Sequence, residues 1–362
     1  MLKSPSIQEN VPLAPLTTLG IGGAARFFVE ACSEGELLEA VAFAGQRQLP
    51  VFILGGGSNV LIADEGFPGL VIRVAIKGIA WNQEITAGAG EDWDDFVRQC
   101  VERNLAGVEC LSGIPGLVGG TPVQNVGAYG QEVSETITNV RVFDRQSNCI
   151  VELNNAGCGF AYRASIFNST GKNRYVVLAV TYALVPNGKP AIRYPDLKIF
   201  FAGRTDNPTL REVREAVIAI RSRKGMVITP TDPANDSDCR SAGSFFKNPV
   251  ITAEAFFRLE ASAKEQHLLR DDERIPHFPS SDGKVKVPAA WLIERAGFQK
   301  SFAKGQAGIS SKHTLAIINR GGATTREVLE LVKEIQERTS AKFGVWLTPE
   351  PVFVGIPQSP AH

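Results

Sequence analysis

Two glycine-rich stretches in the first half of the chain constrain its fold more than any other feature. The first, Gly55–Asn59, directly follows the apolar segment Val51–Leu54, which is typical of a buried strand. The second, residues 114–130, contains seventeen residues with five glycines and two prolines, too many for a simple connection. Long ordered loops of this kind are usually functional. The pattern therefore predicts two glycine loops that serve a ligand.

The two loops suit a ligand that carries a diphosphate. Glycines let successive backbone N–H groups turn toward one anion, and Ser58 and Asn59 add side-chain donors. FAD, a dinucleotide with a diphosphate in its middle, meets that demand. A plain tight turn remains the alternative at the first loop. The run Gly20–Ala25 matches a dinucleotide-binding pattern by letter, but the strand-like segment after it excludes that interpretation.

Helix and strand signals alternate along the chain. Capping boxes predict helices that begin after Ser33, Thr209 and Thr324, and Gly344 is expected to end the last one. Apolar residues at helical spacing predict another helix over Glu91–Arg103. Strands are predicted at residues 26–31, 51–54, 140–143, 150–153 and 176–184.

These elements predict an α+β chain with a mixed first half. The polar, Pro/Asp-rich stretch 229–239 is interpreted as a connection between domains. The predicted parts are an N-terminal lead at 1–16, an FAD-binding region at 17–225 with subdomains of about 17–75 and 76–225, and a C-terminal domain at 226–356.

Composition limits the partners. The 38 basic and 38 acidic side chains cancel among the 362 residues, so no net field favours nucleic acid or a membrane surface. No apolar run approaches the ~20 residues that cross a bilayer, and the first ten residues do not resemble a secretory signal. The six cysteines are scattered, which favours reduced thiols and no metal site. We expect a cytoplasmic monomer.

Five stretches, in order, resemble the UDP-N-acetylenolpyruvoylglucosamine reductase family. The match covers roughly residues 16–355, and the segment Ile192–Leu197 resembles the longer (type I) form of the family. The five stretches are Gly55–Asn59, residues 114–130, Phe160–Phe167, Ala242–Pro249 and Trp346–Glu350.

The resemblance implies a fold, a reaction and two cofactors. The fold would be an FAD-binding domain of the vanillyl-alcohol-oxidase (PCMH) type, followed by a smaller α+β substrate-binding domain. The reaction would reduce UDP-N-acetylglucosamine enolpyruvate to UDP-N-acetylmuramate for peptidoglycan, with NADPH as the hydride source. Reduced FAD would place a hydride on the enolpyruvyl methylene carbon. The first loop lacks His and Cys, so we expect non-covalent FAD.

The resemblance also assigns residues. The catalytic residues would be Arg163, Ser244 and Glu350, and the substrate ligands Tyr162, Tyr194, Lys224 and Asn248. The cofactor-binding residues would be Gly55, Gly56, Gly57, Ser58, Asn59, Pro115, Gly116, Gly119, Gly120, Gly127 and Tyr129.

The chemistry of the three catalytic candidates suits an enolate. The Arg163 guanidinium pairs bidentately with a carboxylate. Glu350 would have to stay protonated beside the developing charge. The Ser244 hydroxyl is a poor acid that needs a nearby cation, for which Lys247 and Lys224 are candidates. The alternative for Arg163 is a surface salt bridge, and that for Glu350 is an exposed position at a strand end. The alternative for Ser244 is a cap.

Other features leave alternatives open. The proline that usually follows the family's lysine is missing after Lys224, and His313 is interpreted as structural. A sugar or lactone oxidase of the same fold is one competing function. A flavoprotein that binds a nucleotide sugar without turnover is the other.

Overall fold

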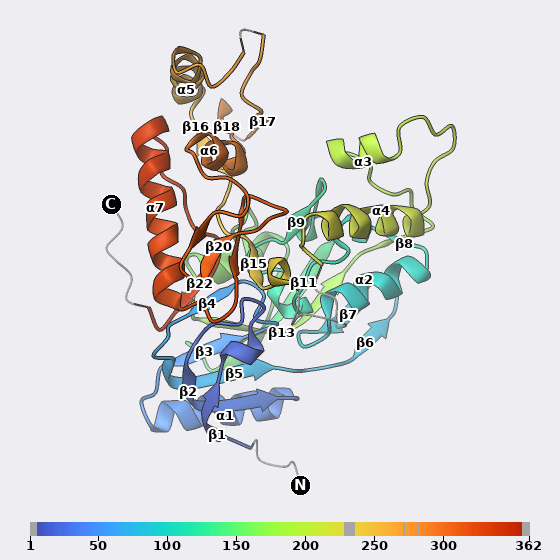
Figure 1. Cartoon of the computed structure of the whole chain (residues 1–362). Helices are drawn as coiled ribbons and strands as arrows, with labels where there is room; N and C mark the ends of the chain where they lie inside the picture. The colour runs from blue at the N-terminus through green and yellow to red at the C-terminus, as the bar shows by residue number, and fades with distance from the viewer. Residues whose placement is uncertain (1–5, 228–235, 271, 281–282, 357–362) are drawn as a thin grey trace. The chain divides into compact units, whose positions relative to one another are not determined.

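The computed structural model describes residues 6–227, 236–270, 272–280 and 283–356 (Figure 1). Within these ranges the chain forms two units. The first consists of residues 6–16, 24–58 and 66–227, and the second of residues 17–23, 59–65 and 236–356. Two short segments of the predicted FAD-binding region thus belong to the second unit. Most of the predicted connection at 229–239 lies outside the described residues.

A four-stranded sheet in the first unit leads to the first glycine loop. Its order is β1-β2-β5-β3, with β2, β5 and β3 parallel and β1 antiparallel at one edge. Helix α1 packs on β2 and β5 (Figure 1). The elements are β1 (Gln8–Pro12), β2 (Ala24–Ala31), α1 (Glu34–Gln46), β3 (Val51–Leu54) and β5 (Phe67–Val74).

Two details differ from the sequence-based prediction. Residues 8–12, expected to lie in a loose lead, form strand β1, which pairs with β2. The capping box at α1 is only half present. The Ser33 side chain accepts from the Glu36 N–H, but the Glu36 carboxylate accepts from the N–H of Cys32.

A five-stranded antiparallel sheet of order β12-β11-β13-β7-β6 completes the framework of the first unit. One hydrophobic core contains residues of both sheets, from Val29 in β2 to Tyr182 in β13. The predicted strands and helices of this region are confirmed, with ends shifted by a few residues. The elements are β6 (Ile79–Trp81), β7 (Ile85–Gly88), α2 (Trp93–Glu102), β11 (Ile137–Asp144), β12 (Cys149–Asn154), β13 (Tyr175–Tyr182) and α4 (Leu210–Arg223).

Smaller elements of the first unit carry several candidate site residues. Strand β8 pairs with β14, and β9 with β10. The short helix α3 has Pro195 in its first turn. The elements are β8 (Leu105–Ala106), β9 (Gly127–Ala128), β10 (Gln131–Glu132), β14 (Val185–Pro186) and α3 (Pro195–Phe200).

Within its described residues, the second unit contains three sheets and three α-helices. The sheets have the orders β15-β21-β20-β19, β16-β18-β17 and β22-β4, the last of which is parallel. The strands are β4 (Val60–Ile62), β15 (Ser241–Ser244), β16 (Val250–Ile251), β17 (Phe278–Pro279), β18 (Val285–Lys286), β19 (Ala303–Lys304), β20 (Ala307–Ile309), β21 (Ala316–Asn319) and β22 (Val352–Val354). The helices are α5 (Ala253–Glu265), α6 (Ala289–Arg295) and α7 (Thr325–Phe343).

Helix α7 shows why this unit folds as it does. Thr324 and Glu327 form a reciprocal capping box at its start, and Gly344 ends it with a φ of 65°. One face buries Val328, Leu331 and Ile335 in a core that also contains Leu61 of β4. Helices and strands mix in both units, which agrees with the predicted α+β class.

Candidate functional site

The two glycine loops contact each other in the first unit. The Ser58 hydroxyl donates to the carbonyl of Pro115 at 2.9 Å. A Cβ atom at Gly56 would lie 2.7 Å from the Cα of Gly116, so the close approach requires glycine at position 56. Gly57 has a φ of 65°, in the left-handed region that favours glycine. The sequence-based pairing of these loops at one site agrees with this geometry.

Backbone hydrogen bonds hold the second loop along the start of α2. The N–H of Val118 donates to Glu91, that of Gly119 to Ala89, and that of Trp93 to Gly116. A Cβ at Gly119 would lie only 2.6 Å from the Cβ of Ala89. Packing within the first unit therefore explains glycine at position 119.

Packing does not explain glycine at Gly55 and Gly120. A Cβ atom at either position would meet no atom of the described residues within 4 Å. Both glycines therefore have open space beside their backbone, and the two loops lie next to each other. Such an arrangement is typical of a site where a ligand lies against main-chain N–H groups. The residues of the two loops therefore fit the FAD diphosphate that the sequence predicted.

Three other candidate residues gather around a β-hairpin of the first unit. Tyr129 and Gly130 form the turn between β9 and β10, with φ values of 50° and 83°, as a type I′ turn requires. The Tyr129 and Tyr194 rings meet edge to face, with centroids 5.5 Å apart. The Lys224 Nζ lies 5.9 Å from the centroid of Tyr129. A predicted cofactor residue thus lies beside two predicted substrate residues.

Burial tunes the two tyrosines. It raises the pKa of Tyr129 to about 12, against the opposing effect of the Arg221 charge. Burial also raises the pKa of Tyr194, and the nearby charge of Asp196 adds to this rise. Both phenols therefore remain neutral hydrogen-bonding groups at physiological pH.

Arg221, which was not predicted as a site residue, anchors the start of the second glycine loop. Its guanidinium is buried and donates to the carbonyls of Gly113, at 3.1 Å, and Met226, at 3.0 Å. The N–H of the same Gly113 donates to Asp94, so both sides of this residue's backbone are held. Burial lowers the pKa of Arg221. The signal was its position four residues after Val217, on the inward face of α4.

Arg163 lies in a tight turn and contacts the hairpin. Ala161 and Ala164 exchange backbone hydrogen bonds around Tyr162 and Arg163. Arg163 has a φ of 53°, and its Nη2 donates to the carbonyl of Gly127 at 2.7 Å. The guanidinium also lies 5.4 Å from the centroid of the Tyr162 ring. The turn thus directs this side chain toward another predicted site residue.

The second unit brings Ser244 and Glu350 together on adjacent backbone segments. Phe245, which follows Ser244, accepts the Glu350 N–H at 2.9 Å. The Nδ2 of Asn59 donates to the Glu350 carbonyl at 3.4 Å. Strand β15 has a register shift between Ser241 and Ser244, and such bulges often redirect side chains near active sites. Both predicted catalytic side chains are half-buried.

Asn248 is attached to a helix. Its Oδ1 accepts from the N–H of Ala289, at 2.9 Å, at the start of α6. Helix α6 has no side-chain cap from its N-cap residue, Pro288, so Asn248 supplies this bond from elsewhere in the chain. His313 accepts the Leu315 N–H through Nδ1, which agrees with its interpretation as structural.

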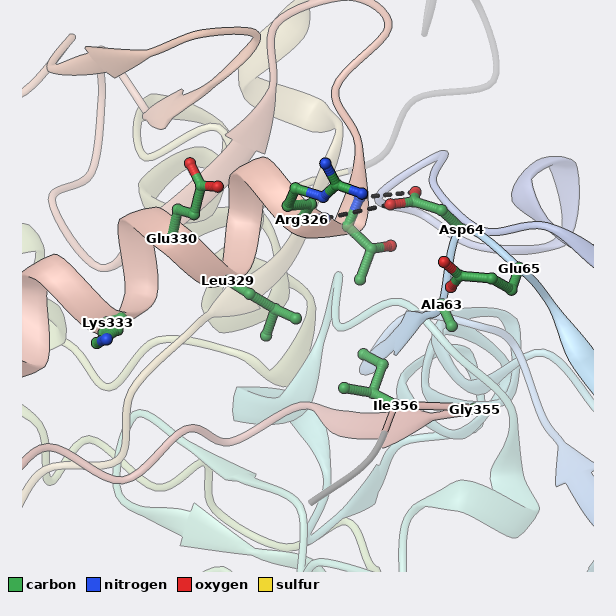
Figure 2. Close-up of a pocket in the computed structure, with 10 residues that line it drawn as sticks. Ala63, Asp64, Glu65, Arg326, Leu329, Glu330, Lys333, Gly355 and Ile356 are labelled. Atoms are coloured by element: carbon green, nitrogen blue, oxygen red, sulfur yellow. Dashed lines mark hydrogen bonds between the residues drawn. The ribbon is translucent and has the colours of Figure 1, made fainter. Parts of the chain in front are cut away.

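Figure 2 shows a pocket of the second unit that contains none of the predicted site residues. It lies at the start of α7 and is lined by acidic, basic and apolar side chains, among them Glu330, Lys333 and Leu329. The Asp64 carboxylate accepts the N–H groups of Thr325 and Arg326, at 2.8 and 3.2 Å. These helix donors are therefore already satisfied by the protein itself.

The described part of the chain contains no helix that is long and apolar enough to cross a bilayer.

All six cysteines are free thiols, and burial raises the pKa of Cys100 to about 12.

Two family models match this chain. The C-terminal domain of UDP-N-acetylenolpyruvoylglucosamine reductase matches residues 232–354, and an FAD-binding domain matches residues 25–153. The residues through which the two glycine loops contact each other all lie within the match to the FAD-binding domain. FAD is therefore the cofactor of this fold.

Relatives match over almost the whole chain. A UDP-N-acetylenolpyruvoylglucosamine reductase of Thermobifida fusca is 46% identical and covers 97% of this chain and 99% of its own. One of Streptomyces coelicolor is 45% identical, over 97% and 91%. The crystal structure of the same reductase from Thermus caldophilus has a TM-score of 0.65 at 26% identity, over 97% and 99%. This chain belongs to the UDP-N-acetylenolpyruvoylglucosamine reductase family.

Proposed function

We propose that this chain reduces UDP-N-acetylglucosamine enolpyruvate to UDP-N-acetylmuramate, a precursor of peptidoglycan, with NADPH as the hydride source. Membership of the reductase family supports the overall reaction. The adjacency of Ser244 and Glu350 in the second unit supports the assignment of residues, because both belong to the same backbone pairing. Bound FAD would supply the hydride-transfer chemistry, with NADPH as the source of the hydride and the enolpyruvyl methylene carbon as its acceptor.

The glycine loops hold the diphosphate of FAD in this proposal. Gly55 and Gly120 leave room for the ligand, while Gly56, Gly116 and Gly119 let the supporting segments pack closely. Backbone N–H groups bind the phosphate oxygens without a basic side chain. Arg221 and Asp94 hold Gly113 and so fix the root of the second loop.

Arg163 binds the substrate carboxylate. As the hydride arrives, negative charge builds on the carbon next to this carboxylate, and a guanidinium stabilises that charge. The hydrogen bond from Arg163 to Gly127 limits the positions the side chain can take. Tyr162, Tyr194, Lys224 and Asn248 bind other parts of the nucleotide sugar.

Ser244 gives its proton to the same carbon, which completes the reduction of the double bond. Glu350, in its protonated form, donates a hydrogen bond to the developing enolate. Phe245 and Phe246, which follow Ser244, are almost fully buried and limit the entry of water. One of the two candidate cations, Lys247 or Lys224, stabilises the Ser244 alkoxide until the serine recovers a proton.

The substitution Ser244→Ala tests this assignment. Flavin reduction by NADPH should proceed at the wild-type rate, because it needs no proton from Ser244. Reoxidation by the enolpyruvyl substrate should slow about 10²- to 10⁴-fold, the usual effect of removing one acid group. Stopped-flow absorbance of the flavin measures the two half-reactions separately.

Ser241→Ala is the matched control, since Ser241 begins the same strand, and both half-reactions should stay within about threefold of wild type. Unchanged reoxidation in Ser244→Ala would show that Ser244 only shapes the strand. FAD-bound protein that never oxidises NADPH in the presence of the substrate would overturn the reductase proposal itself.

A further inference from the structure

The cation proposed to bind the substrate already has an anionic partner within the protein. The Lys224 Nζ donates to Asp196 Oδ2 at 2.8 Å. Lys224 is the C-cap residue of helix α4, directly after Arg223, and Asp196 lies in the first turn of α3. About a third of each side chain is exposed, 34% for the lysine and 35% for the aspartate. The pair is therefore accessible to a ligand and only partly screened by solvent.

Asp196 is held in place by the packing of α3. The next residue, Leu197, is fully buried among Val213 and Val217 of α4. Tyr194, two residues before Asp196, accepts the N–H groups of Leu197 and Lys198 through its carbonyl, and its ring contacts Tyr129. Asp196 therefore loses little conformational freedom when it pairs with Lys224.

The last turn of α4, just before Lys224, carries two positive charges. Arg221 and Arg223 lie in the same last turn of α4. Arg221 is committed to the carbonyls of Gly113 and Met226, and Arg223 is exposed. The carboxylate of Asp196 thus occupies the position on Lys224 that a phosphate oxygen needs.

We propose that Asp196 is a positioning residue that holds Lys224 beside Tyr129 and that the substrate diphosphate must displace. This inference rests on the proposed role of Lys224 as a diphosphate ligand. The carboxylate keeps the ammonium in place before the substrate arrives, and it lowers the affinity for the diphosphate in two ways. The ion pair has to break, and a negative charge remains near the bound phosphates.

A competing ion pair of this exposure has a modest effect on an equilibrium constant. Partly exposed pairs shift equilibria by roughly two- to fivefold. A ligand with two charged phosphate groups can displace the carboxylate, because it brings more negative charge to the same ammonium. An uncharged sugar cannot. Only a ligand with enough negative charge therefore replaces Asp196 on Lys224.

The test is UDP binding by calorimetry to the FAD-bound protein and its variants. Asp196→Asn should bind UDP about two- to fivefold more tightly at low salt. The gain should disappear at about 1 M salt, where the screening length is about 3 Å. Asp196→Glu, which keeps the charge, should restore the wild-type affinity. A purely structural role for Asp196 would not produce this dependence on charge and salt.

Two further variants make the test specific. Asp206→Asn is the matched control, because Asp206 forms an exposed ion pair with Arg204 in the segment that follows α3, and its UDP affinity should not change. In a Lys224→Ala background, Asp196→Asn should give no gain in UDP affinity. The ammonium for which Asp196 and the phosphate compete is then absent. An equal or weaker affinity of Asp196→Asn, or the same gain without Lys224, would overturn the inference. If Lys224→Ala alone binds UDP as wild type does, the proposed role of Lys224 fails instead.

Discussion

The side-chain amide of Asn248 has two chemically different ends, and the fold uses one of them. Its Oδ1 accepts the Ala289 N–H, so the amide nitrogen must face away from the start of α6. Asn248→Asp keeps an acceptor for the helix but loses the donor and adds a charge. The melting temperature should therefore change by only a few degrees. The KM for the substrate should rise about tenfold or more, as expected for a lost hydrogen bond to a charged group.

Asn248→Ala serves as the comparison, because it removes both ends of the amide. It should raise KM to a similar extent and also destabilise the fold by about 0.5–2 kcal/mol, the usual effect of losing a helix cap. Thermal unfolding and steady-state kinetics measure the two effects. An unchanged KM in Asn248→Asp would assign this residue to the helix alone.

At the same scale, the sequence grouped residues that lie close together, but it did not predict what they touch. Tyr194, Lys224 and Tyr129 do lie close together, as a shared ligand site requires. The bond from Asn248 to α6 and the burial of Arg221 depend on segments far apart in the chain. No local pattern contains such contacts, so they could not be predicted from the sequence.

Among the elements, the two glycine loops allow a matched pair of substitutions. Gly56→Ala places a methyl group 2.7 Å from the Gly116 Cα and should destabilise the FAD-free protein by about 1–3 kcal/mol. Gly55→Ala meets no protein atom within 4 Å, so the FAD-free protein should keep its stability. It should nevertheless bind FAD more weakly if the cofactor lies against this backbone. Thermal unfolding without FAD and fluorescence titration with FAD separate the two effects.

Wild-type FAD affinity in Gly55→Ala would place the diphosphate elsewhere. Gly45→Ala, in helix α1, is a control in which the added Cβ also meets no described atom within 4 Å. It should not weaken FAD binding, because α1 carries no predicted ligand of the cofactor.

Capping boxes made two helices predictable, whereas short helices and an exposed strand left no such signal. A cap alone was not enough, because helix α5 was not predicted although Thr252 caps it and one of its faces is buried. Helices α4 and α7 each have a capping box and a buried stripe. Helices α3 and α6 have six and seven residues and no side-chain cap from the N-cap residue, so they leave little periodic signal. Strand β1 exposes nearly every residue, and an edge strand of this kind has no apolar alternation to detect.

For the whole molecule, the path of the chain links the stability of the two units. Residues 17–23 and 59–65 belong to the second unit, although the segments around them belong to the first. If the second unit unfolded alone, residues 17–23 and 59–65 would become flexible loops whose ends the folded first unit holds in place. Each closure costs on the order of 2–3 kcal/mol. This is a large part of the 5–15 kcal/mol that stabilises a typical domain.

The second unit should therefore gain stability from a ligand of the first. FAD at about 100 times its Kd stabilises the folded state by about 2.7 kcal/mol, or about a hundredfold in the unfolding equilibrium. The slowest-exchanging amides of α7, around Leu331 and Ile335, lie in the core of the second unit and exchange through its unfolding. Hydrogen exchange with mass spectrometry should show these amides slowed by FAD nearly as much as those of β13. Independent units would instead leave the α7 amides unchanged while those of β13 slow, and the linkage through the chain path would be wrong.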